Sequence, residues 1–257
     1  MKGALSGLPL AFFLGIYYLN MIRSYGFDTL EGLLLLSYGF LEIESIIYVV
    51  PVIIWILPQI HLTYLLKDYI SDSIETSGAY IFTRTKKKYR WMLGRVLELF
   101  CNVAMYYFVQ FTFVALIGII KGLSPSRGYI GLTIIFTEFV LVCLLNFFYV
   151  ALINIGALRM KVTYSYFFTI FLNIFLILFA GFLYQFDASK IYLIKYLPPS
   201  QGILTWHSFG DIADKYQEAF RFTVQNFSPL FSAIYLIVAS MILIVYGNFR
   251  LKNMDIY

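Results

Sequence analysis

The sequence predicts an all-α membrane protein with about six transmembrane helices, forming a single domain over residues 1–257. Three observations predict it. Hydrophobic residues make up 61% of the chain and charged residues only 13%, whereas a soluble domain usually carries about 25% charged residues. The apolar residues gather into runs of the roughly 20 residues needed to cross a bilayer core. These runs are too uniformly apolar for barrel strands, which alternate lipid-facing and lumen-facing residues.

Six runs are long enough to span a membrane. They are Ala4–Ile22, Ile46–Leu66, Met92–Ile120, Ile130–Leu158, Val162–Tyr184 and Leu230–Gly247. The third and fourth are longer than a span requires, so we expect them to tilt or to extend past the bilayer. A chain of 257 residues has no room for a large soluble domain beside these spans.

The lysines and arginines predict an orientation. With both termini in the cytoplasm, most of the 19 basic residues lie on the inner side, as the positive-inside rule requires. The densest cluster falls between the second and third runs, at Lys67, Arg84, Lys86, Lys87, Lys88, Arg90 and Arg95. The net charge of +5 is therefore explained by topology and by contact with membrane lipid, and we expect no nucleic-acid partner.

Two predicted outer loops have distinctive sequences. The first, Arg23–Ser45, is semi-apolar, and we expect it to dip into the membrane interface. The third, Gln185–Pro229, is the longest, and within it the stretch Asp211–Val224 has helical spacing. Its apolar and small residues near one face are Ile212, Tyr216, Ala219, Phe220 and Thr223. This spacing predicts an amphipathic helix lying on the outer surface before the sixth span.

The loop between the second and third runs has helical spacing of its own. Asp68, Asp72 and Glu75 are four and three residues apart, so they share one helical face. Around Gly78 the pattern breaks, and a basic run, Lys86–Arg90, follows. Taken alone, the basic run is typical of a topology anchor at anionic headgroups. The alternative is a short helix along the membrane that docks a cytoplasmic partner.

The residue order in this loop resembles a known family. The matching residues are Glu75-Thr76-Ser77-Gly78-Ala79, Phe82-Thr83-Arg84, Trp91, Gly94 and Arg95. They resemble the permease subunits of type-2 ABC exporters, in which Glu, a small residue and Gly are followed by Thr or Ser and later by Gly-Lys. Ala79 stands where that family usually has Thr or Ser, Arg95 where it has Lys, and Arg84 where many members have Pro.

The resemblance implies a function and a set of partners. In that family this loop is a coupling helix that inserts into a groove of the ATPase subunit, which makes Glu75, Ser77, Gly78 and Arg84 the expected contacts. It implies two permease chains, identical or homologous, with two ATPase copies in a bacterial cytoplasmic membrane. The likeness to small Gram-positive permeases implies export of an apolar or amphipathic substrate, such as an antimicrobial peptide. The chain has no phosphate-binding loop of its own, so ATP hydrolysis is expected only in the partner.

Four polar residues inside the predicted spans are candidate functional residues. Glu138 and Gln110 lie at similar depth in the outer half of their spans, where they could hydrogen-bond to each other. Asn146 and Asn173 lie near mid-depth. Interhelical hydrogen bonds are one interpretation of all four. The other is that they line a translocation path, since ionisable groups in a bilayer are costly.

Other functions are less favoured by the sequence. A stand-alone membrane scaffold or immunity protein, which binds without transport, remains the alternative from another class. An intramembrane enzyme would need a motif such as H-E-x-x-H or a Glu-Glu dipeptide, and the sequence contains neither. Cys101 and Cys143 lie inside apolar runs, and His61 and His207 are far apart, so we expect neither a disulfide nor a metal site, and no cofactor. Near the start of the third span, Arg95 and Glu98 are spaced for a local ion pair.

Overall fold

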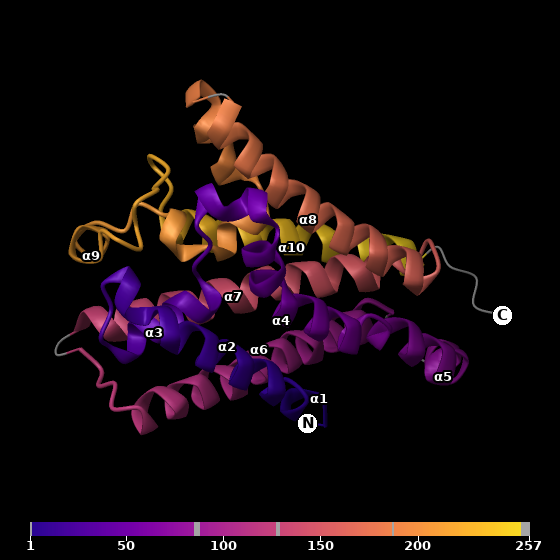
Figure 1. Cartoon of the computed structure of the whole chain (residues 1–257). Helices are drawn as coiled ribbons and strands as arrows, with labels where there is room; N and C mark the ends of the chain where they lie inside the picture. The colour runs from indigo at the N-terminus through magenta and orange to yellow at the C-terminus, as the bar shows by residue number, and fades with distance from the viewer. Residues whose placement is uncertain (1, 85–87, 127–128, 187, 253–257) are drawn as a thin grey trace.

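The computed structural model describes residues 2–84, 88–126, 129–186 and 188–252, with only the backbone of residues 2, 4, 77–84, 188 and 211. The described residues are helical apart from turns, loops and one isolated bridge between Thr29 and Ser124. The all-α prediction is therefore confirmed (Figure 1).

Five helices are long and apolar enough to cross a membrane. They are α4 (Val50–Leu66) with the start of α5 (Tyr69–Arg84), α6 (Lys88–Ile120), α7 (Tyr129–Gly156), α8 (Val162–Phe186) and α10 (Pro229–Lys252). They correspond to the second to sixth predicted runs. The chain is thus suited by length and composition to a multi-pass membrane protein.

The first predicted run does not form a membrane-length helix. It is divided into α1 (Lys2–Leu5) and α2 (Leu8–Met21), and the 14 residues of α2 span only about 21 Å at 1.5 Å per residue. Where the two meet, Gly7 lies so close to α6 that an added Cβ would come within 2.6 Å of Nε2 of Gln110. The junction of α1 and α2 therefore lies beside α6. Five of the six predicted runs form membrane-length helices in the described residues.

The first outer loop enters the bundle instead of lying at the interface. After η1 (Ile22–Tyr25), helix α3 (Leu30–Tyr38) runs between α6 and α7 with all nine of its residues buried. Its last ring, Tyr38, stacks on Phe111 of α6 at 4.5 Å between centroids. The physical reason is composition: most of the helix is apolar and therefore stable when buried. Its one charged residue, Glu31, accepts bonds from the backbone N–H of Ser126 at 3.2 Å and the hydroxyl of Tyr216 at 3.3 Å. The chain then returns through η2 (Ile43–Tyr48) to α4.

The long segment before α10 is also packed into the molecule. It consists of the 3₁₀ helices η3 (Ala188–Tyr196), η4 (Pro199–Gly202) and η5 (Leu204–Trp206), then α9 (Asp211–Lys215). The predicted amphipathic helix over Asp211–Val224 is wrong, because only α9 forms and the chain leaves the helix at Tyr216. Ile212, Tyr216, Ala219 and Phe220 are nevertheless buried, whereas Thr223 is exposed. The spacing therefore predicted the burial of four of these five side chains, but not the backbone conformation.

The two inserted segments meet inside the bundle. The carbonyl of Gly39, just after α3, accepts a hydrogen bond from the backbone N–H of Thr205 at 3.1 Å. The carbonyl of Leu41 accepts one from the indole of Trp206 at 2.7 Å, and that of Tyr38 accepts one from the indole of Trp55 at 3.0 Å. These bonds give partners to backbone carbonyls that lie outside helices. Non-helical backbone at membrane depth needs such partners, because lipid offers none.

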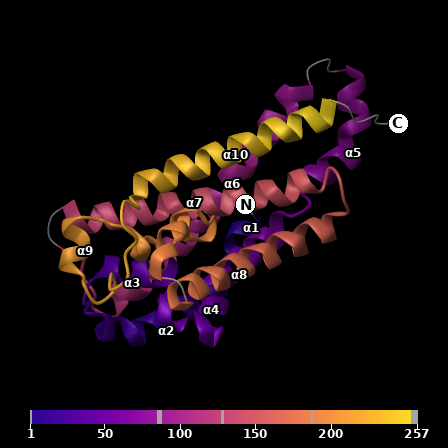
Figure 2. The ribbon, with the colours of Figure 1, turned by 90° about the horizontal axis from the view of Figure 1, so that it is seen from above.

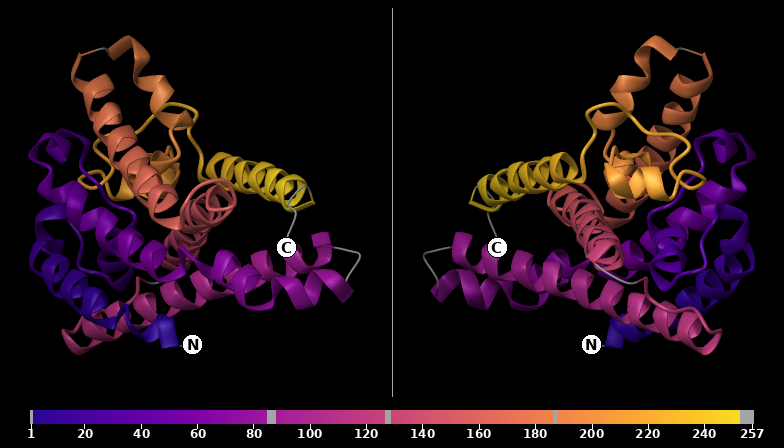
Figure 3. Two further views of the ribbon diagram at one scale, coloured as in Figure 1. Left: turned by 90° about the vertical axis from the view of Figure 1, so that its right-hand side faces the viewer. Right: turned by 90° about the vertical axis from the view of Figure 1, so that its left-hand side faces the viewer.

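Helix α7 is the centre of the molecule. It contacts α10, α6, α3 and α8, and the end-on views in Figure 3 show these helices around it. Figures 1 and 2 agree that α5 and the last residues of α10 lie at one end of the bundle, and that α3 and α9 lie at the other. We refer to these as the α5 end and the α3 end. The predicted orientation makes the α5 end cytoplasmic.

Candidate functional site

The junction between α4 and α5 is held by a buried asparagine on α7. The side-chain amide of Asn154 donates to the carbonyl of Leu66 at 2.7 Å and to that of Val150 in its own helix at 2.9 Å. Its Oδ1 accepts the backbone N–H of Ile70 at 2.9 Å. Helix ends leave such N–H and C=O groups without partners. One fully buried side chain therefore satisfies the last turn of α4 and the first turn of α5.

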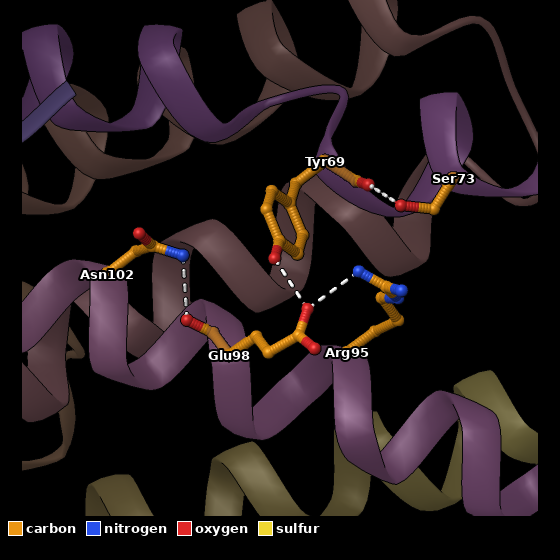
Figure 4. Close-up of polar contacts among 5 residues, drawn as sticks. All are labelled: Tyr69, Ser73, Arg95, Glu98 and Asn102. Carbon is orange, nitrogen blue, oxygen red and sulfur yellow. Dashed lines mark hydrogen bonds and ion pairs between the residues drawn. The ribbon is translucent and has the colours of Figure 1, made fainter. Parts of the chain in front are cut away.

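A second polar contact ties α5 to α6, as Figure 4 shows. The hydroxyl of Tyr69, the first residue of α5, donates to Oε2 of Glu98 at 2.7 Å. The same oxygen pairs with Nη1 of Arg95 at 2.7 Å, so the predicted ion pair is confirmed. Ser73 bonds back to the carbonyl of Tyr69, and Asn102 to that of Glu98, each at 2.8 Å. The start of α5 is therefore fixed to both neighbouring helices.

Helix α5 continues from Tyr69 to Arg84 without the break predicted at Gly78. A single glycine inside a helix costs only about 1 kcal/mol relative to alanine, which good neighbours on both sides can offset. Of the four expected ATPase contacts, Glu75 is exposed. The side chains of Ser77, Gly78 and Arg84 lie outside the described residues. The exposed face that is described also includes Asp72 and Thr76, so this face is acidic and polar.

Glu138 lies at the meeting point of the two inserted segments. It is completely buried on α7, and neither carboxyl oxygen has a hydrogen-bond partner among the described residues. It packs against Gly39, where an added Cβ would overlap the carboxyl group. The expected bond to Gln110 is not formed. Instead, Oε1 of Gln110 accepts the hydroxyl of Tyr38 at 3.1 Å, so α3 lies between the two candidate residues.

The two predicted asparagines differ in their contacts. Asn173 on α8 accepts the hydroxyl of Tyr149 on α7 at 2.8 Å and donates to Gln59 on α4 at 3.1 Å. It is thus the expected interhelical contact. Asn146 instead donates to the carbonyl of Val142 in its own helix at 2.9 Å, and its buried Oδ1 has no partner in the described part of the chain.

Sequence reasoning missed two residues that join segments. Asn154 was detectable, because it is a polar residue inside an apolar run, as Asn146 is. His207 gave no signal, since Ser232, the partner that joins it to α10, is 25 residues away. Its ring is fully buried, with Nδ1 3.0 Å from the carbonyl of Ile203 and Nε2 2.6 Å from the hydroxyl of Ser232 on α10. Burial lowers the pKa of His207 to about 4, so the ring is neutral at pH 7.

Within the described residues, no group of three or more His, Cys, Asp or Glu side chains could hold a metal ion. Comparisons with family models, with curated proteins and with solved structures found no match for this chain. The residues themselves therefore carry the functional argument. They form a polar helix fixed to two long helices at one end, and a buried carboxyl group where two inserted segments meet.

Proposed function

We propose that the chain is the membrane-spanning permease subunit of an ABC exporter. A separate ATPase subunit hydrolyses ATP, and the chain couples this to export of an apolar or amphipathic substrate across a bacterial cytoplasmic membrane. The observation that carries the proposal is α5, a helix between two membrane-length elements with an exposed acidic face. Its residue order resembles the ATPase-docking loop of type-2 exporters. The working complex contains two permease chains and two ATPase copies.

The contacts of α5 support a mechanical role. Movement of α5 is passed to α6 through the Tyr69–Glu98 bond and to α7 through Asn154. Helix α7 also carries Glu138, which packs against the tip of the first inserted segment at Gly39. Docking and release of an ATPase at α5 would therefore shift α7 against the two inserted segments. A two-state element of this kind is what coupling between distant sites requires.

The substrate path in this proposal passes Glu138. A buried carboxyl group without a partner is costly in a bilayer and marks a functional position by default. Separation of the segments that meet at Gly39 and Thr205 would open the space beside it. Gln110, Asn146 and Asn173 remain candidates for the same path or for helix contacts.

Docking is tested with the double variant Glu75→Ala with Arg84→Ala. Each residue offers a charge-assisted hydrogen bond worth about 1.5–3 kcal/mol, so we expect the affinity for the ATPase to fall roughly tenfold or more. The span helices do not depend on these side chains, so the melting temperature should be unchanged. The measurement is co-purification of the chain with ATPase subunits from its own cells, followed by titration of the chain with any ATPase that it captures.

The matched control changes an oppositely charged, exposed pair at the α3 end, Asp214→Ala with Lys215→Ala. We expect this variant to bind the ATPase with wild-type affinity. Wild-type affinity in the Glu75–Arg84 variant would show that the basic loop is only a topology anchor. A wild-type chain that captures no ATPase would instead favour the stand-alone membrane binding protein.

A further inference from the structure

A small aromatic cavity lies at the α3 end, away from α5, and one of its lining residues, Phe40, directly follows Gly39, which packs against Glu138. It measures about 160 Å³ and is formed by the end of α2, η1 and the residues that lead from α3 into η2. Its polar and aromatic lining consists of three tyrosines, one phenylalanine, one carboxylate and one serine hydroxyl, from Tyr17, Tyr18, Tyr25, Phe40, Glu42 and Ser45. Nothing in the proposed ATPase coupling uses these residues.

The rings are arranged as two edge-on pairs. Tyr17 and Tyr18 meet at 5.0 Å between centroids and 88° between planes, and Tyr25 and Phe40 meet at 4.6 Å and 62°. Aromatic rings have negative faces and positive edges. In each edge-on pair one ring face is covered by the edge of its partner, and Tyr17 also stacks on Phe13 at 6.0 Å between centroids, so the remaining ring faces are those that can contact a ligand. A cation is the ligand that such faces attract, most strongly when water is excluded.

The carboxylate is available for a ligand. Glu42 is half-buried, and its side chain forms no hydrogen bond or ion pair with the described residues. Its backbone carbonyl caps the following turn by accepting from Ser45, but the carboxylate takes no part. Burial and the nearby Glu42 carboxylate raise the pKa of Tyr25, and Arg221 opposes them. The negative group therefore lies beside the aromatic walls.

We propose that this cavity binds the alkylammonium head of an amphipathic molecule. Its volume of about 160 Å³ equals roughly five times the 30 Å³ that a water molecule occupies in the liquid. That is enough for an ammonium group and its substituents, but below the roughly 300 Å³ where pockets for whole drug-sized ligands begin. The apolar remainder of the ligand would lie along the exposed residues beside the cavity, Ile47, Tyr48, Val49 and Val50.

Two kinds of molecule carry such an alkylammonium head: a membrane lipid with an amine headgroup, and an amphipathic cationic cargo. Binding at this site needs no ATPase, so the experiment uses the full chain alone in lipid nanodiscs. If no ligand bound here, the proposed ATPase docking would be unaffected. If no ATPase docked at α5, ligand binding at this cavity would be unaffected.

The test is photolabelling with two probes that differ only in the head. One is a dodecylammonium carrying a diazirine next to the nitrogen, and the other is the matching neutral alcohol. The wild-type chain, the Glu42→Gln variant and the Glu44→Gln variant are each placed in nanodiscs of phosphatidylglycerol, a lipid without an amine. Glu44 is the matched control, because this neighbouring carboxylate accepts a bond from Tyr184 and does not line the cavity. Mass spectrometry locates labels on the peptides that contain Tyr17–Tyr25 and Phe40–Pro51.

We expect the ammonium probe to label the wild-type cavity roughly fivefold more than the alcohol probe, and Glu42→Gln to remove this difference. Glu44→Gln should retain it. Tyr17→Leu, which removes one wall, should lower ammonium labelling as well. Equal labelling by the two probes in wild type, or wild-type labelling in a well-folded Glu42→Gln, would overturn the proposal. Competition by added phosphatidylethanolamine would assign the site to a lipid head, and ammonium labelling that survives it would assign the site to a cargo.

Discussion

Two buried asparagines on α7 show how one residue type can have different structural consequences. Asn154 satisfies a backbone carbonyl and a backbone N–H at the junction of α4 and α5. Asn146, two turns earlier, donates only to its own helix. Removing a buried hydrogen-bond partner costs the desolvation of the groups left behind. The consequence of a substitution therefore depends on how many other segments each asparagine serves.

This difference predicts unequal effects of the same substitution. Asn154→Leu should lower the free energy of unfolding by about 1–3 kcal/mol, because Leu66 O and Ile70 N lose their partner. Asn146→Leu should cost less, since no other segment loses a bond. Thermal unfolding of the two variants in the same detergent is the measurement. Equal melting temperatures would contradict the assigned role of Asn154.

His207 predicts an acid-sensitive contact between η5 and α10. Burial lowers the pKa of His207 from 6.5 to about 4, although hydrogen bonds to the backbone of Ile203 and Leu204 raise it in part. When a base has a lower pKa in the folded state than in the unfolded state, the folded state is favoured at any pH above the unfolded-state pKa. This contribution is lost as the pH falls from about 6.5 towards 4. The full shift corresponds to roughly 3 kcal/mol.

The measurement compares melting temperatures at about pH 7.5 and about pH 5, where part of that contribution is already lost. Wild type should lose more stability on acidification than His207→Gln, whose side chain does not titrate. A similar loss in both proteins would show that other groups cause the acid sensitivity.

At the scale of elements, the long apolar runs could be predicted from sequence and the inserted segments could not. Runs two to six became α4, α6, α7, α8 and α10, because length and uniform apolarity leave a helix as the stable structure. α3 lies within the stretch Arg23–Ser45, which was expected to be an interfacial loop because it is only semi-apolar. Its burial depends on the space between α6 and α7, which is a tertiary property. The Glu138–Gly39 contact is invisible in the sequence for the same reason.

That contact predicts a coupled pair of substitutions. Gly39→Ala places a Cβ where the Glu138 carboxyl group lies, and overpacking of this kind typically costs about 1–3 kcal/mol. In a Glu138→Ala background the obstruction is absent, so Gly39→Ala should cost much less. A double-mutant cycle of melting temperatures measures the coupling. Additive effects of the two substitutions would mean that the tip of α3 does not rest on Glu138.

For the whole molecule, the sequence predicted the charge asymmetry, and the structure shows where the charges gather. Basic residues at the α5 end belong to the start of α6, the turn between α7 and α8, and the end of α10. The positive-inside rule predicts that this end is cytoplasmic. Gly7, between α1 and α2, lies beside Gln110 of α6, and the cytoplasmic N-terminus remains a prediction. The remaining proposals for α5 depend on this orientation.

The most direct test of the account is the side of the membrane on which α5 lies. Single cysteines at the exposed positions Glu75 on α5 and Gln217 beside α9 are introduced after Cys101 and Cys143 have been replaced by alanine. Intact cells are treated with a membrane-impermeant maleimide. If α5 is cytoplasmic, Gln217→Cys is labelled in intact cells and Glu75→Cys is labelled only after permeabilisation. Labelling of Glu75→Cys in intact cells would contradict this orientation and would remove α5 from any cytoplasmic ATPase.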